Sequence, residues 1–554
     1  MRASRIVLAL FVLLAFCPIT AAQAVQINAH TFNVNSTGDQ GDHTPGNCVC
    51  SIATATGGLC TLRAAVQEAN ACAGDDDIVL DNGATYILGS FISVNHTSGL
   101  QTERIILYTD NNSNADAIIK ASGAKNYPVF SVGVGTLNLT NVTIRDSEGV
   151  SVASDATLNL NDVLMTANYN DNYDPLDMRS GGGALQNSYG SISIYNSRFI
   201  SNTTTGCGGA IQNHGNLSID FSTFNSNTAL NGGAICHVGW INPSTNEQYG
   251  MSISRTEIGN NQAPKSPTLG GGNGGGIFIA GPNRSNTQVT ILNSTIIGNS
   301  SNWGGGIFIG PTSSDSFGGG LTLIDSSVLN NQAGNGGGIM IYNTGNIYAR
   351  YETYLENSTL SGNQALMHGG GIYMPATGTL AISNSTISAN IADSDGNDNG
   401  DGGGIRSSNL QNELRMENTI LAGNLDASTG EQATVVHDCR GKLDLFGYNL
   451  IGKLDTSKCI VNTDATTLSG TNAAPLDPLL GPLDYYGYSI YTHQLMPGSP
   501  AINAGDPTGC KDPLDSAILH DQRGESRPYG SRCDIGAVEV QYSVKKAFLP
   551  MIIR

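Results

Sequence analysis

Three carboxylates in this 554-residue chain stand at related positions. Asp325, Glu356 and Glu417 each follow a short apolar run, and Glu356 and Glu417 share one phase of a repeat, two repeats apart. Hydrolysis of a glycosidic bond needs two carboxylates about 5–9.5 Å apart across a cleft. Exposed strands also carry stray acids, so these residues support only an alternative hypothesis, a polysaccharide hydrolase or lyase. The basic residues that a lyase would need beside clustered acids are scattered: Arg145, Arg198, Arg255 and Arg350.

An oxygen-rich run between residues 393 and 401 is the candidate metal site. Asp395, Asn397 and Asn399 match the first half of a calcium-binding loop, and Asp401 adds a further carboxylate. The position that should hold the closing glutamate holds Arg406. A solvated turn is the competing interpretation, so calcium is an optional cofactor and no other cofactor is expected.

Aromatic residues occur in longer inserts at one phase of consecutive repeats. Such inserts line one side of a repeat protein, which is often its binding side. Their rings could stack on sugars, or they could pack on the protein as ordinary loop residues. The candidate ligand-binding residues are Trp240, Tyr249, Phe317, Tyr348 and Tyr351.

A repeat of strand-like segments must position all these candidates. A Gly-Gly-Gly-Ile-like run begins eight times from Gly181 to Gly402, followed each time by alternating apolar residues and an Asn-Ser-Thr-like triplet. The alternation predicts strands, and the spacing predicts a solenoid. An asparagine then recurs at one phase, at Asn202, Asn227, Asn261, Asn299, Asn331, Asn363, Asn390 and Asn424.

This recurrent asparagine favours a parallel β-helix over other solenoids. Its amide can bond to the amide of the coil above and of the coil below, as in stacked in-register strands. The glycine runs fit sharp turns where the next coil stacks about 4.8 Å away. We therefore expect an all-β solenoid of roughly 11–14 coils, at 24–33 residues per coil.

The ends of the chain differ from the repeat. Residues 1–24 are typical of a signal peptide, and Thr61 to Cys72 predict a short capping helix. We expect an N-terminal disulfide cap over 25–77, repeats over 78–429, a C-terminal cap over 430–540 and a tail over 541–554. The tail is either a sorting signal or a docked final strand. The tail is too short to span a bilayer, and no stretch after residue 24 approaches the 18 apolar residues of a transmembrane helix.

The cysteines indicate disulfides in an oxidising compartment. Ten remain after cleavage of residues 1–24, mostly near the two ends. Cys48 and Cys50 are too close to pair with each other, which leaves two connectivities with Cys60 and Cys72. Sequence neighbourhood suggests the pairs Cys439–Cys459 and Cys510–Cys533, and the remaining two are Cys207 and Cys236.

Composition excludes several classes of protein. The net charge of −19 argues against a protein that binds nucleic acid, because such binding depends on Lys and Arg. With 39% apolar and 13% charged residues, the chain lacks the signature of long disorder. Its 70 glycines have no three-residue period, which excludes collagen.

Three motifs resemble parts of exported bacterial proteins. Cys60 to Asn70 resembles the CSLREXLRD-type N-terminal domain, with Ala64 where that family has Glu. Asp477 to Leu483, Thr492-His493, Pro497 to Gly505, Asp521 to Gly524, Arg527-Pro528 and Cys533 to Glu539 resemble the choice-of-anchor Q domain. The repeats are similar to right-handed, pectate-lyase-like β-helices and to polymorphic outer-membrane protein repeats. The resemblance implies a secreted or surface-attached protein and no particular reaction, with His493 in a structural role.

The main hypothesis is therefore a non-enzymatic surface protein, such as an adhesin, scaffold or envelope component. Its partners would be polysaccharides or other cell-surface glycans or proteins. The polysaccharide lyase or hydrolase is the alternative, and a calcium-dependent self-associating protein is the third possibility. The oligomeric state is left open.

Overall fold

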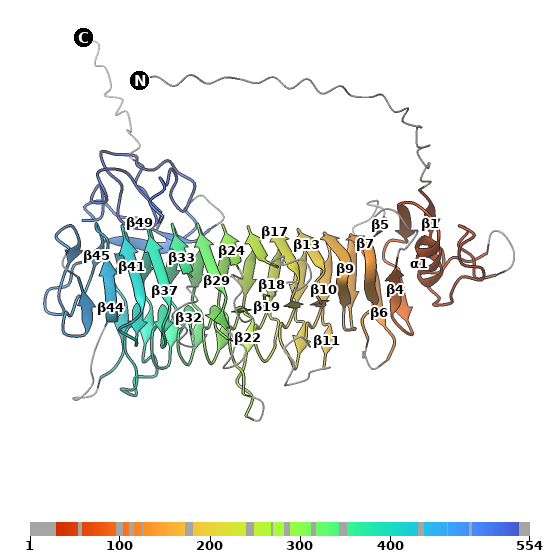
Figure 1. The fold of residues 1–554 in the computed structure, drawn as a ribbon, viewed down its shortest axis with the longest axis horizontal. Coiled ribbons are helices and arrows are strands. Elements are labelled where there is room, and N and C mark those ends of the chain that lie inside the picture. The colour runs from red at the N-terminus through yellow and green to blue at the C-terminus, as the bar shows by residue number, and fades with distance from the viewer. Residues whose placement is uncertain are drawn as a thin grey trace, which may run out of the picture.

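The chain forms a rod of stacked β-coils, seen here in a computed structural model (Figure 1). The expected parallel β-helix is thereby confirmed. The expected signal peptide and the tail after Gln541 lie outside the described residues. The structure describes residues 29–53, 58–95, 104–109, 116–123, 127–171, 181–239, 249–267, 270–281, 288–311, 317–342, 352–429, 437–462, 464–486, 490–512 and 514–541.

Each coil repeats the same short strands. One coil contains β36 (Ile372–Met374), β37 (Thr379–Ser383), β38 (Thr386–Ser388) and β39 (Ile391–Ala392). The first two belong to the largest sheet (the first sheet), β38 to a 14-stranded sheet (the second sheet) and β39 to a six-stranded sheet (the third sheet). Every second residue points inward, so that Leu380 and Ile382 are buried in a continuous apolar column.

The stack continues beyond the expected boundary at residue 429. Strands β44 (Cys439–Leu445) and β45 (Leu450–Ile451) pair in parallel with the coil before them. The second sheet thus runs from β3 (Thr85–Leu88) to β47 (Leu468–Ser469). The final coils lack the glycine run, which is why the repeat pattern ends earlier in the sequence.

A short helix covers the N-terminal end of the rod, as expected (Figure 1). Helix α1 (Leu62–Ala71) begins after Thr61, whose hydroxyl accepts a hydrogen bond from the Ala64 amide at 3.1 Å. It buries Leu62, Val66 and neighbouring small residues against the first coils. No helix in the described part of the chain is long and apolar enough to cross a membrane.

The predicted asparagine ladder runs through the buried interior. The Asn331 amide donates to Asn363 Oδ1 at 2.9 Å and to the Ile296 carbonyl at 3.0 Å. Its own Oδ1 accepts from the backbone and side-chain amides of Asn299, both at 2.9 Å. The ladder begins at Ser147 and ends at Asp438, which accepts from Asn424. Each of these side chains satisfies backbone groups at a turn, in a place where no water reaches.

The glycine runs are explained by close approach between coils. A Cβ atom on Gly305 would lie 2.3 Å from the Gly337 carbonyl oxygen of the next coil. No other residue fits at that separation without moving the backbone.

Five disulfides form among the described cysteines. The first four cysteines pair as Cys48–Cys72 and Cys50–Cys60, which resolves the connectivity left open by the sequence. The suggested pairs Cys439–Cys459 and Cys510–Cys533 are both present. The fifth disulfide, Cys207–Cys236, joins two neighbouring coils.

Residues 476–541, here named the C-terminal segment, lie along the side of the rod near its C-terminal end (Figure 1). Gln522 contacts two coils: its side-chain nitrogen donates to Ser327 Oγ at 2.9 Å, and its side-chain oxygen accepts from the Thr359 hydroxyl at 2.5 Å. His493 is held between the Gly481 carbonyl at 2.7 Å and Ser361 Oγ at 2.9 Å. Burial lowers the pKa of His493, so the ring stays neutral in this structural role.

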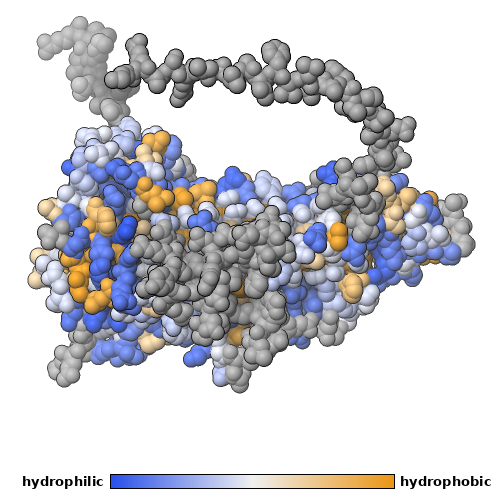
Figure 2. All heavy atoms as spheres, in the orientation of Figure 1, coloured by the Kyte–Doolittle hydropathy of each residue, from blue (hydrophilic) through white to orange (hydrophobic). Residues whose placement is uncertain are grey.

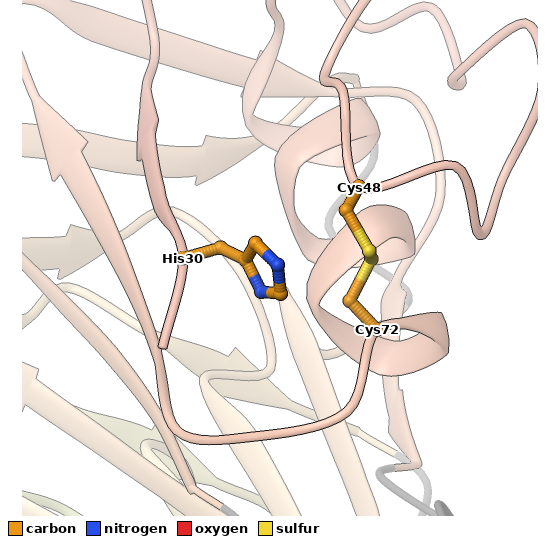
Figure 3. A group of neighbouring side chains, drawn as sticks. All are labelled: His30, Cys48 and Cys72. Atoms are coloured by element: carbon orange, nitrogen blue, oxygen red, sulfur yellow. A yellow bond between two sulfur atoms is a disulfide. The ribbon is translucent and has the colours of Figure 1, made fainter. Parts of the chain in front are cut away.

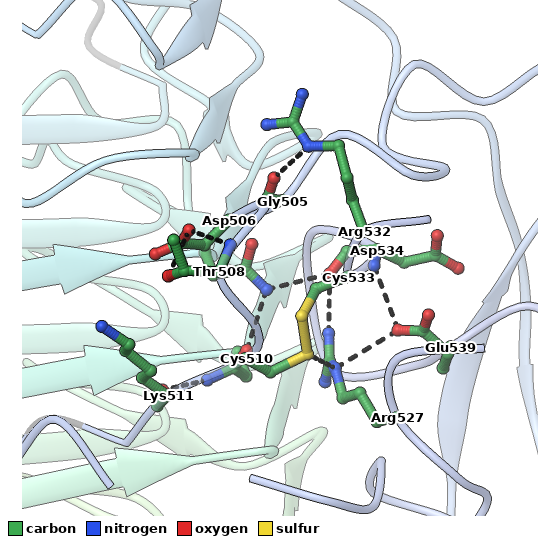
Figure 4. Close-up of a disulfide and its surroundings, with 12 residues drawn as sticks. Gly505, Asp506, Thr508, Cys510, Lys511, Arg527, Arg532, Cys533, Asp534 and Glu539 are labelled. Carbon is green, nitrogen blue, oxygen red and sulfur yellow. Dashed lines mark hydrogen bonds and ion pairs between the residues drawn. A yellow bond between two sulfur atoms is a disulfide. The ribbon is translucent and has the colours of Figure 1, made fainter. Parts of the chain in front are cut away.

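A buried arginine organises this segment beside the Cys510–Cys533 disulfide (Figure 4). Arg527 is fully buried, and its Nε atom lies 3.3 Å from Glu539 Oε2. The same guanidinium donates to Asn357 Oδ1 on a coil at 3.0 Å and to the Asp534 carbonyl at 2.7 Å. Ile420 and Leu450 of the coils pack against Leu495 and Ile535 of the segment. The segment is therefore fixed to the rod by polar and apolar contacts together.

Substitution of a ladder asparagine should destabilise the rod. We expect Asn331→Ala to lower the free energy of unfolding by about 2–4 kcal/mol. The substitution leaves buried polar groups on both neighbouring coils without their hydrogen-bond partner. Asn159→Ala is the matched control, since it removes one amide bond, to Asn138, at a half-exposed site and should cost under about 1 kcal/mol. Chemical denaturation followed by circular dichroism measures both, and equal losses would contradict the proposed role of the ladder.

Candidate functional site

The three predicted carboxylates lie on the side of the rod that the C-terminal segment covers. Glu356 and Glu417 both pair with Ser383, which confirms that they share a phase two coils apart. Asp325 stands one residue later in its coil, in a turn with φ of 47°. Next to this row, Asn357 donates to the His520 carbonyl of the segment at 2.7 Å. A polymer would have to displace the segment to contact these acids fully.

Burial and neighbouring charges perturb all three carboxylates. Burial raises the pKa of Glu356 to about 7, and Asp325 and Asp512 add to the shift. Burial raises the pKa of Glu417 to about 7, with Asp506 as the next cause. Burial also raises the pKa of Asp325 to about 6, although a hydrogen bond from Asn357 opposes the shift. Such values suit a general acid near neutral pH, but they also follow from docking of the segment alone.

The predicted metal ligands differ in burial and in their bonding partners. Asp395, Asn397 and Asn399 are exposed and bonded within their own loop, with Asn397 Nδ2 donating to Asp395 Oδ2 at 2.9 Å. Asp401 is buried elsewhere, paired with Arg406 and with Arg440 Nε at 3.1 Å. Two guanidinium groups thus balance the charge of Asp401, and the calcium site stays a prediction.

A second group of potential metal ligands contains two cysteines that are joined in a disulfide. His30 lies beside Cys48 and Cys72, with the ligand atoms within 4.8 Å of one another. The two sulfur atoms form a disulfide, so neither is a thiolate (Figure 3). His30 Nδ1 also lies 3.0 Å from Asp76 Oδ1, which orients the ring structurally.

Of the five predicted aromatic side chains, only that of Tyr249 lies within the described structure. Tyr249 is buried, and its ring centroid lies 6.1 Å from that of Tyr189. The backbone of Phe317 belongs to the short strand β28 (Phe317–Gly318), which pairs antiparallel with β23 (Ile277–Gly281). Trp240, Tyr348 and Tyr351 lie outside the described residues.

A different row of residues, at a turn between the first and second sheets, departs from the repeat. Its members have φ of about 45–54° in successive coils, a conformation that asparagine and aspartate tolerate best. Most members are Asn or Asp, but Phe221 and Arg255 occupy two consecutive positions. Bulky residues held in this conformation are strained, and such strain concentrates at functional sites. The sequence carries this signal, because both residues replace the asparagine of the Asn-Ser-Thr triplet.

Phe221 and Arg255 are exposed and contact each other. The Arg255 guanidinium lies 4.0 Å from the centroid of the Phe221 ring. Its Nε donates to Asp220 at 2.9 Å, and a second nitrogen contacts the other carboxylate oxygen. The exposed ring of Tyr195 meets Phe221 edge to face at 5.8 Å. These contacts hold an aromatic and a planar cation on the surface of the rod.

This pair forms one wall of a pocket at the edge of the C-terminal segment, here named the junction pocket. Its volume is about 350 Å³. The coils contribute Phe221, Arg255 and Glu257, while the segment contributes Tyr485, Gln522 and Arg523. Figure 2 shows a mostly hydrophilic surface with apolar residues gathered where the segment meets the coils. Aromatic faces next to fixed hydrogen-bonding groups are suited to a sugar ring.

Comparisons with known proteins do not identify the chain. No family model matches it, and no curated protein matches it. A solved structure, ORF18 of Geobacillus virus E2, is 13% identical with a TM-score of 0.27 over 64% of this chain. The chain spans 59% of the length of that protein. A likeness at this TM-score carries no argument about function.

The half-buried carboxylates predict a distinctive pH dependence of stability. Because the folded-state pKa of Glu356 is raised, its contribution to stability is full below about pH 4.5 and is lost as the pH rises through about 7. We expect Glu356→Gln to stabilise the protein at pH 8 by about 1–2 kcal/mol, after allowance for solvent screening, and not at pH 4. Thermal unfolding of the variant and the parent protein at pH 8 and at pH 4 measures this difference in stability. The exposed-site control Asp155→Asn should show no such difference, and an unchanged Glu356→Gln variant at pH 8 would contradict the assignment.

Proposed function

We propose that this protein is an exported, surface-located β-helix that binds glycans without cleaving them. The observation that carries the proposal is the strained pair Phe221 and Arg255, which lines the junction pocket. Most other coils have asparagine or aspartate at this position of the turn, so the turn itself does not call for either residue. Both offer what saccharide recognition uses, an exposed ring and a planar hydrogen-bond donor.

Export is supported by the cysteines and by the first residues of the chain. Five disulfides among the described residues fit an oxidising compartment, and residues 1–24 have the pattern of a signal peptide. The resemblances to the CSLREXLRD-type and choice-of-anchor Q domains point to the same place, the bacterial surface. In that setting the protein would serve as an adhesin, a scaffold or an envelope component.

A polysaccharide hydrolase or lyase is the second candidate function. It is favoured by one observation, the pKa of about 7 for Glu356 next to Asp325. Against it, the C-terminal segment packs over the adjacent turn row through Asn357, Asn384 and Asn418.

A glycan-array screen of residues 25–554 separates these functions. The readouts are retention and the release of new reducing or unsaturated ends, each with calcium and with chelator. Retention without cleavage supports a binding protein. Cleavage that is abolished by Glu356→Ala or Asp325→Ala would replace the proposal with the enzyme. Binding that is lost with chelator would support the acidic loop around Asp395 as a calcium site.

Replacement of Phe221 by the residue typical of the row should separate binding from stability. We expect Phe221→Asn to lower glycan affinity at least tenfold, because the exposed ring is lost. Its unfolding temperature should equal or exceed that of the parent protein, because asparagine tolerates φ of 49° better than phenylalanine. Calorimetry of binding and of unfolding measures both effects.

Phe446→Ala is the matched control, since Phe446 is also exposed and lies 5.4 Å from the Arg415 guanidinium, outside the pocket. An equal loss of affinity in this variant, or none in Phe221→Asn, would refute the junction pocket as the binding site.

A further inference from the structure

A third departure from the repeat lies in the junction pocket, on the outward face of the second sheet. One position of this sheet faces the C-terminal segment and stays in register from coil to coil. Glu257 of β21 (Glu257–Gly259) occupies that position in one coil. The neighbouring coils have a hydroxyl there: Thr223, Thr295, Ser327, Thr359 and Thr386.

The hydroxyl residues under the segment have a structural task. Ser327 and Thr359 bond to Gln522, and Thr386 accepts from the Ala537 amide at 3.1 Å. Glu257 stands in the same row where the pocket opens, and its side chain is exposed. No hydrogen bond or ion pair of its carboxylate occurs among the described residues. Within the described residues, its carboxylate therefore does not bond the segment to the rod.

Glu257 is also the unbalanced charge of the pocket. Arg255 is paired with Asp220. Arg523, whose side chain is 7% exposed, is paired with Asp521 at 2.7 Å. Both ion pairs are neutral overall, so the pocket presents one net negative charge from Glu257.

The ring of Tyr485 adds to the preference for a cation. Burial, a hydrogen bond with Tyr491 and the charge of Glu257 raise the pKa of Tyr485, so its hydroxyl stays neutral. Exposed aromatic rings attract ammonium groups through their negative faces. The net charge of −19 on the chain attracts cationic ligands at longer range and repels anionic ones.

We propose that Glu257 makes the junction pocket selective for glycans that carry protonated amines, such as polymers of unacetylated hexosamine. This inference rests on the proposed function, because it assumes that the pocket binds saccharides. The rings of Phe221 and Tyr485 contact the sugar, and Glu257 pairs with its ammonium group. A polymer with acetylated nitrogens keeps the ring contacts and loses the charged one.

Calorimetric titration of residues 25–554 tests the selectivity with two probes, glucosamine oligomers and their fully N-acetylated counterparts of equal length. At low salt we expect the free-amine oligomer to bind about tenfold more tightly, as one charge-assisted contact provides. Glu257→Gln should abolish this difference while affinity for the acetylated oligomer stays unchanged. The difference should also shrink as salt screens the pair.

The outcomes separate this inference from the proposed function. Equal binding of the two oligomers by the parent protein, or a preference retained in Glu257→Gln, would overturn the amine selectivity and leave glycan binding standing. Absence of binding to either oligomer and to the glycan array would overturn both. The control Asp155→Asn removes the same charge at an exposed position outside the pocket and should retain the full preference, so loss there would assign the effect to net charge and overturn the role of Glu257.

Discussion

In-register stacking of coils is the constraint on which the rest of the molecule depends. Parallel strands of neighbouring coils lie about 4.8 Å apart, so each residue meets its equivalent in the next coil. Inside, this contact favours the asparagine ladder, because every amide finds a donor and an acceptor on its neighbours. At the turns it requires glycine, since Gly305 lies against the carbonyl of Gly337. Repetition in the sequence is thus a direct consequence of repeated contact in space.

The same constraint makes departures from the repeat informative. A turn with φ near 50° is occupied most easily by asparagine or aspartate, and most coils follow this rule. Phe221 and Arg255 do not, and their contacts, with each other, with Asp220 and with Tyr195, lie on the surface of the rod. Glu257 likewise stands among hydroxyl residues without a partner in the described structure. These three departures lie on two consecutive coils and line one pocket.

Periodic features of the structure could be predicted from the sequence, whereas contacts between distant segments could not. The β-helix, helix α1 and the ladder from Asn202 to Asn424 follow from patterns within a few repeats. The pairing of Cys48 with Cys72 depends on how one loop closes, which the spacing left open. The contact of Gln522 with Ser327 joins residues 195 positions apart and belongs to no repeat. The row of Phe221 was visible in the triplets, but only the structure shows its conformation and its neighbours.

The C-terminal segment changes what the side of a regular rod can do. A stack of similar coils presents long, shallow surfaces, on which a short ligand would be held from one direction only. The segment adds a second wall, fixed through Gln522 and through Arg527, whose burial is compensated by Glu539 and by Asn357 of a coil. It also lies against the row of Glu356, so that docking partly buries the acids while it completes the junction pocket. One docking event therefore both creates a concave site and explains why the carboxylates beside it have raised pKa values.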